Sequence, residues 1–202
     1  MELGRIVACR LTGDESFIGA GDAESFSVLD YWRWSNSDLV SNASRGILAE
    51  YIVGKALGCD VQVRDEWATY DLLTPERYRV EVKSSAYLQS WHQKKLSTIT
   101  FGYGKRRGWD SETGTEEAEP LRNSDVYVFA LLAHQDQSTL NPLDLAQWKF
   151  YVVPTAWLDA RERSQHSITL PSLRSAFDSV MFCDLRDAVA SAVEAHRRMQ
   201  AG

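Results

Sequence analysis

The segment DVYVFALLA, residues 125–133, is apolar without interruption after its first residue. A strand with one face in water alternates apolar and polar side chains, whereas a strand covered on both faces has no polar positions to keep. The segment therefore predicts a central strand with a layer of structure on each side. The rest of the chain has to supply both layers.

The sequence around this strand predicts helices and strands in mixed order. Residues 44–57 have apolar side chains at helical spacing, polar capping residues before them and Gly58 after them, which predicts a helix. Further strands are predicted at 61–73, 78–85, 96–104 and 148–154, a turn at 74–77, and helices at 155–164 and 183–200. We therefore expect an α/β domain of the α+β kind, a mixed sheet flanked by helices.

Composition separates an N-terminal part from a main domain. Residues 1–40 are polar and rich in glycine and then aromatic, so we expect an extension packed on the core. Residues 41–202 are expected to form a single domain with a charged loop at 105–124. The apolar fraction of 44% and the charged fraction of 25% are typical of a globular protein.

Charge and cysteine content bear on the partners and the compartment. The net charge is −6, but five acidic residues lie together in 110–119, and binding depends on local charge, so DNA is not excluded. There is no apolar run long enough for a membrane span, no apolar signal-peptide core at the start, and an odd number of cysteines, three. We expect a cytoplasmic protein without a membrane partner.

The segment YDLLTPERYRVEVKSS, residues 70–85, places three ionisable side chains on a predicted hairpin. Residues two apart in a strand share a face, so Glu81 and Lys83 point the same way. With the turn centred near Glu76, paired positions sum to about 152, which sets Asp71 opposite Glu81 with the Cβ atoms about 5 Å apart. Two carboxylates this close repel unless a divalent cation lies between them, and hard oxygen ligands suit Mg²⁺ or Mn²⁺.

Two further side chains could serve such a site. The ammonium of Lys83, about 7 Å along the strand from Glu81, could orient a water or stabilise charge on a phosphate. Glu50, in the preceding helix, could complete the acidic cluster if that helix packs over the sheet. The alternative is that Glu81 and Lys83 are solvent-facing strand residues and that Asp71 is an acid flanking a turn.

Glu50 in a helix, then Asp71, then EVK (Glu81-Val82-Lys83) in a strand resembles the PD-(D/E)XK phosphodiesterase superfamily, which has the restriction endonuclease-like fold. The resemblance implies that Asp71 and Glu81 bind Mg²⁺ with the carbonyl of Val82. It also implies that Lys83 assists the attacking water and that Glu50 supports the metal or its waters. Many such enzymes form a homodimer to cut two strands.

The resemblance covers residues 44–133 and has two departures. Leu72 follows Asp71 and Tyr70 precedes it, so the proline of the family name is missing. The second core helix of the family corresponds either to residues 86–95 or to 155–164.

Other polar residues could contact DNA. Ser84 and Gln89 could bind a phosphate, although both could equally satisfy local structure. Lys105, Arg106 and Arg107 lie among glycines at a strand end and predict a basic finger that grips the DNA backbone, the alternative being a solvated hairpin tip. The sequence thus predicts a Mg²⁺-dependent DNA endonuclease. The alternative is a catalytically inactive nucleic-acid- or protein-binding module with the same fold, against which the intact acid–acid–lysine set argues.

Overall fold

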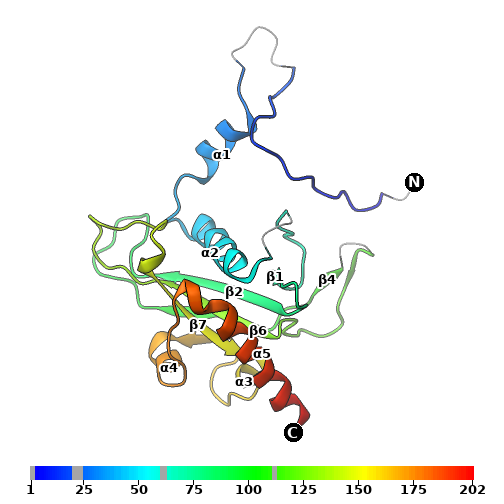
Figure 1. Ribbon diagram of the computed structural model, residues 1–202, viewed down its shortest axis with the longest axis vertical. Helices are drawn as coiled ribbons and strands as arrows, with labels where there is room; N and C mark the ends of the chain where they lie inside the picture. Colours follow the sequence, from blue (N-terminus) through cyan, green and yellow to red (C-terminus); the bar gives the residue numbers. More distant parts are fainter. Residues whose placement is uncertain (1–2, 20–24, 60–62, 111–112) are drawn as a thin grey trace.

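The computed structural model describes residues 3–19, 25–59, 63–110 and 113–202. Its centre is a four-stranded sheet with the order β1-β2-β6-β7 (Figure 1). β2 (Arg79–Ala86) runs antiparallel to β1 (Leu72–Leu73) and parallel to β6 (Val126–Leu132), which runs antiparallel to β7 (Trp148–Pro154). The sheet is therefore mixed, as predicted.

The central strand β6 is covered on both faces. All seven of its residues are buried, as the apolar sequence predicts. Alternate residues belong to two different hydrophobic clusters: Val128 packs in one, and Tyr127 and Phe129 pack in the other. Truncating a core phenylalanine such as Phe129 to alanine costs about 3–5 kcal/mol. Because side chains of β6 enter both clusters, this strand packs against the layers on both faces of the sheet.

Two long helices cover the first face of the sheet. α2 (Asn42–Leu57) and α5 (Leu185–Ala201) pack on a cluster that includes Val80 and Val82 of β2. α2 begins where the Ser41 hydroxyl accepts a hydrogen bond from the Ser44 amide. It ends at Gly58, whose φ of 72° is left-handed and suits glycine.

Short elements cover the second face. They are β3 (Thr100–Gly102), which pairs with β8 (Ser167–Thr169), and the helices α3 (Thr155–Asp159) and α4 (Leu170–Arg174). The remaining elements are the hairpin of β4 (Trp109–Asp110) and β5 (Thr115–Glu116), and the 3₁₀ turns η1 (Leu145–Gln147) and η2 (Phe182–Asp184). No helix in the described ranges is long and apolar enough to cross a membrane.

Some of the predicted elements are shorter than expected. The predicted strand at 61–73 is wrong for the described residues except Leu72 and Leu73, and residues 61–62 lie outside the described part. The strand at 96–104 covers three residues, and the helix at 155–164 ends at Asp159. The burial predicted from alternation nevertheless holds, because Ile99, Phe101 and Tyr103 are all buried.

The second long helix on the sheet is α5, which lies at neither of the two positions proposed for a second core helix, whereas the short helix α3, within 155–164, packs on the other face. Ala86 ends β2, and residues 87–95 form bends and irregular structure. The Gln93 side chain donates to the carbonyl oxygens of Tyr87 (3.2 Å) and Lys95 (3.4 Å) and accepts from the Gln89 amide (2.7 Å). A side chain that bonds to the backbone in this way competes with a helix.

The N-terminal extension stands apart from the sheet. α1 (Val28–Asn36) has a capping box between Ser27 and Asp30 but no buried residue, and in Figure 1 it projects away from the α/β body. An ion pair of 2.7 Å between Arg5 and Asp65 joins the segment to the loop before β1. The packing of residues 1–40 on the core therefore stays a prediction.

Candidate active site

Asp71 lies at the edge of the sheet, opposite Glu81. The observed register pairs Leu72 with Val80 and Leu73 with Arg79, so paired positions sum to 152 as predicted. Asp71 itself is outside β1, and its Oδ2 accepts a hydrogen bond of 2.7 Å from the amide of Val82. The carboxylate thus takes the place of a backbone partner at this edge of β2, which fixes its position.

Lys83 connects the two acids. Its ammonium donates a hydrogen bond to Oε1 of Glu81 and lies 3.9 Å from Oδ2 of Asp71. The exposed side-chain fractions are 20% for Lys83, 19% for Asp71 and 11% for Glu81, so water screens these charges only in part. The structure therefore brings together the three residues that the hairpin register predicts.

The charges of this group do not balance. Burial raises the pKa of Glu81, the nearby carboxylate of Asp71 raises it further, and the ammonium of Lys83 opposes both effects. The Ser124 hydroxyl lies 3.5 Å from Oε2 of Glu81 and donates to it. Two carboxylates and one ammonium carry a net charge of −1 when ionised, so an additional cation at this place would be stabilised.

Glu50 does not join the two acids. Its carboxylate is bound by Arg64, with 3.0 Å between Nη2 and Oε1, and Arg64 also interacts electrostatically with Asp71. The reason is topological, since α2 packs on the face of Val80 and Val82 whereas alternate residues of β2 point to the other face. Within the described ranges no group of three or more His, Cys, Asp or Glu side chains could hold a metal ion.

The donors that are present still fit a hard divalent cation. In proteins Mg²⁺ is usually bound by one or two carboxylates, with water and substrate phosphate as the other ligands. Asp71 and Glu81 supply the carboxylates. A strand residue directs its carbonyl to the same edge as its amide, so the carbonyl of Val82 faces the same edge as Asp71.

A pocket of about 380 Å³ opens beside the acids. Its lining includes Asp71, Glu81 and Tyr127 together with four arginines: Arg64, Arg106, Arg107 and Arg122. Tyr127 is paired with Glu81 across β2 and β6, and burial raises the pKa of its hydroxyl, which therefore stays protonated at neutral pH. The pocket is thus lined both by the two acids and by arginines.

The predicted basic finger only partly reaches this pocket. Arg106 and Arg107 line it, whereas Lys105 is exposed and does not. Arg107 lies 3.5 Å from Glu116 of the acidic hairpin. Arg106 forms no ion pair with another described residue, but its charge acts on Glu81 and Tyr127, so its guanidinium is available to an anion in the pocket.

Ser84 and Gln89 are directed elsewhere. Both accept hydrogen bonds of 3.2 Å from the buried guanidinium of Arg45 in α2, which also donates to the Val40 carbonyl (2.9 Å) and Asn42 Oδ1 (2.6 Å). Ser84 shares its face of β2 with Val82, whereas Glu81 and Lys83 point to the other face. The structure therefore does not bring Ser84 or Gln89 to the acidic pair.

Sequence reasoning missed several residues of the site. Arg64 lies in a segment predicted as strand, and Arg122 is at the end of the charged loop, where it binds Asp159, Gln165 and the Tyr103 carbonyl. Neither position has a local signal. The sequence predicts Tyr127 on the central strand but gives no sign that it belongs to the site. Its pairing with Glu81 depends on β2 and β6 being neighbours in the sheet.

Comparison with known families defines the class of this protein. Residues 26–170, more than two thirds of the chain, match a family of endonucleases, and this range includes the acidic pair, Lys83 and the arginine-lined pocket. The chain belongs to the bacteriophage T4 endonuclease IV family, which supports a DNA endonuclease. No curated protein matches the chain.

Proposed function

We propose that this endonuclease is Mg²⁺- or Mn²⁺-dependent, with a site of the PD-(D/E)XK type. Asp71, Glu81 and the carbonyl of Val82 are the proposed ligands, and Lys83 is the proposed partner of the attacking water. One observation carries the proposal: the Lys83 ammonium forms ion pairs with both carboxylates, and these two acids line a pocket together with four arginines.

Each residue of the chain has a separate task in this mechanism. A bound divalent cation would supply a more acidic water and offset the charge that develops on the phosphate. Asp71 is held in place by the amide of Val82, and Glu81 by Lys83 and Ser124. The ammonium of Lys83 positions the water between the two acids and the phosphate.

The proposed contacts to the DNA backbone are the pocket arginines other than Arg122, whose side chain is 1% exposed and bound to Asp159. Arg106 faces the acids without a carboxylate partner of its own among the described residues, so it is the proposed contact to the phosphate that is cut. Glu50 acts through Arg64, which it holds at the mouth of the pocket, near Asp71. Glu50 is therefore a positioning residue in this proposal.

The test is cleavage of DNA by the purified protein with Mg²⁺, with Mn²⁺ and with EDTA. Wild type is expected to cut only with a divalent ion, and Asp71→Asn and Lys83→Met are expected to lose cleavage while keeping the circular dichroism spectrum of the wild type. Glu194→Gln, an exposed acid on α5, is the control and should cut normally.

Equal cleavage by wild type and Asp71→Asn would refute the proposed site. Cleavage that persists in EDTA would refute the metal dependence. DNA binding without cleavage and without cation binding would instead favour the inactive binding module.

A further inference from the structure

Two tryptophans separate the proposed active-site pocket from a second hollow. The first pocket contains Asp71 and Glu81, and the second is lined by residues 5–8 and 63–67. Trp67 and Trp109 belong to the lining of both. The two hollows therefore lie next to each other, with the two indoles on the border between them.

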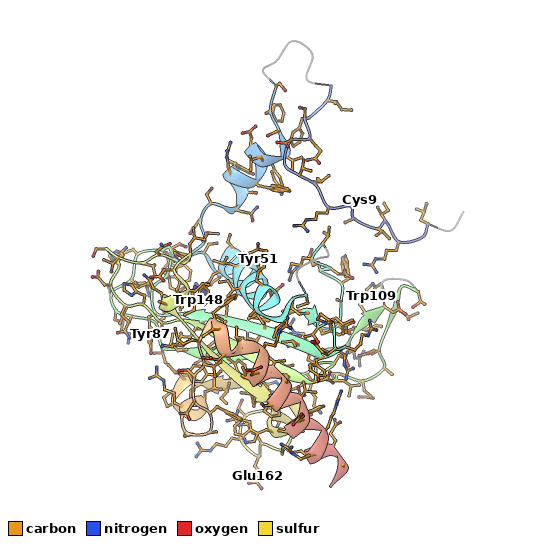
Figure 2. The ribbon with its side chains drawn as sticks, viewed as in Figure 1. Cys9, Tyr51, Tyr87, Trp109, Trp148 and Glu162 are labelled. Atoms are coloured by element: carbon orange, nitrogen blue, oxygen red, sulfur yellow. The ribbon has the colours of Figure 1, made fainter. Side chains whose placement is uncertain are left out.

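Both indoles are unusually accessible for tryptophan. Trp67 is 61% exposed and Trp109 is 44% exposed. They come from different segments, the loop before β1 and the strand β4, and Figure 2 shows Trp109 at the edge of the molecule formed by the β4 hairpin. Large exposed aromatic side chains that line a hollow mark a binding site more often than they serve stability.

The two segments that carry the indoles lie close to each other. A Cβ atom built on Gly108 would lie 2.7 Å from the Thr69 side chain and 2.7 Å from the Glu117 carboxylate, so a larger residue there would displace these side chains. The Gly108 amide donates to Oε2 of Glu117 (3.0 Å), and the Glu117 amide donates to the Gly108 carbonyl (2.8 Å). These hydrogen bonds hold together the hairpin that carries Trp109, and the Thr69 side chain, two residues after Trp67, lies close to it.

Arginines near the indoles favour nucleic acid as the occupant, although Asp65 and Glu66 also line the second hollow. Arg64 lines both hollows, and Arg106 and Arg107 line the pocket on the side of the acids. Arginines that bind phosphates next to aromatic rings that stack on bases are the usual means of holding an unpaired strand. A purely apolar peptide would leave the guanidinium of Arg106, which forms no ion pair with another described residue, without a partner.

We propose that Trp67 and Trp109 form a base-stacking site, which holds one unpaired base beside the phosphate at Asp71 and Glu81. The base comes from a single strand or is turned out of a duplex. This inference rests on the proposed function and adds the residues that position the substrate. Because an indole stacks on any base, the site contributes affinity and position, with little sequence preference.

The test measures binding of labelled oligonucleotides in EDTA, where no cleavage occurs, by fluorescence anisotropy. Trp67→Ala and Trp109→Ala are each expected to raise Kd about 5- to 150-fold, since stacking of one base on an aromatic ring contributes about 1–3 kcal/mol. Trp34→Ala is the matched control, because Trp34 is 84% exposed on α1, which stands apart from the body. The phenylalanine variants should keep most of the affinity and show that the fold is intact.

A second arm removes the base instead of the indole. An oligonucleotide with an abasic position in the stacking site should bind wild type as weakly as the intact oligonucleotide binds Trp109→Ala, and the two changes together should cause no further loss. Unchanged Kd in both alanine variants would overturn the stacking site while cleavage by wild type leaves the proposed function standing. Absence of both binding and cleavage in wild type would overturn the two together.

Discussion

Replacing Lys83 by methionine tests the arrangement on which the site depends. The ammonium contacts Glu81 and lies 3.9 Å from Asp71, so the variant leaves two carboxylates side by side without a cation. At an effective dielectric constant of about 20, a charge pair at this distance contributes about 4 kcal/mol. Removing one partner of a buried ion pair costs about 3–5 kcal/mol in net terms.

The partial exposure of the three side chains reduces this cost, and we expect a loss of about 2–3 kcal/mol for Lys83→Met. For a chain of this size that loss lowers Tm by about 5–10 °C. The assay is urea unfolding at pH 7 in EDTA, with Lys105→Met, an exposed lysine, as the control that should change by less than about 0.5 kcal/mol. Neutralising Glu81 in the same variant should restore part of the loss. Equal stability of Lys83→Met and wild type would refute the reasoning.

Three further predictions follow from the same geometry. Burial and Asp71 raise the pKa of Glu81 above 4.5, so ionising Glu81 in the folded protein costs stability, and wild type should lose stability as pH rises from 4.5 through that raised pKa. Glu81→Gln should therefore be more stable than wild type at pH 7 and equally stable at pH 4. An equal difference in stability at both pH values would contradict this. Arg45→Met should lower the free energy of unfolding by about 2–3 kcal/mol, because four acceptors lose their donor, and a loss below about 0.5 kcal/mol in urea unfolding would show that this network is not needed. The ratio of the wild-type kcat to that of Tyr127→Phe should be constant from pH 6 to 9, since burial keeps the Tyr127 hydroxyl protonated there; a ratio that changes with pH would show that Tyr127 titrates.

The sequence predicts the central part of the fold because its signals are local. The uninterrupted apolar run of β6 and the capped helix α2 each depend on one short segment. The pairing of Asp71 with Glu81 also depends on a single tight turn, so its register could be counted from the sequence.

The predictions that failed depend on contacts between distant segments. Glu50 was expected to complete the acidic cluster, but α2 packs on the opposite face of β2 and Arg64 binds the carboxylate. Ser84 and Gln89 could not be assigned without knowing that Arg45 is buried between them. The residue types of the loop before β1 predict a strand. In the structure the Val82 amide donates to the Asp71 carboxylate, which takes the place of a backbone partner from such a strand.

A crystal structure of the protein soaked with Mn²⁺ tests the central claim most directly. The account predicts anomalous density for one cation between the carboxylates of Asp71 and Glu81, with the Val82 carbonyl as a third ligand and the Lys83 ammonium moved aside. Density elsewhere, or an ammonium that still joins the two acids in the presence of the ion, would contradict it.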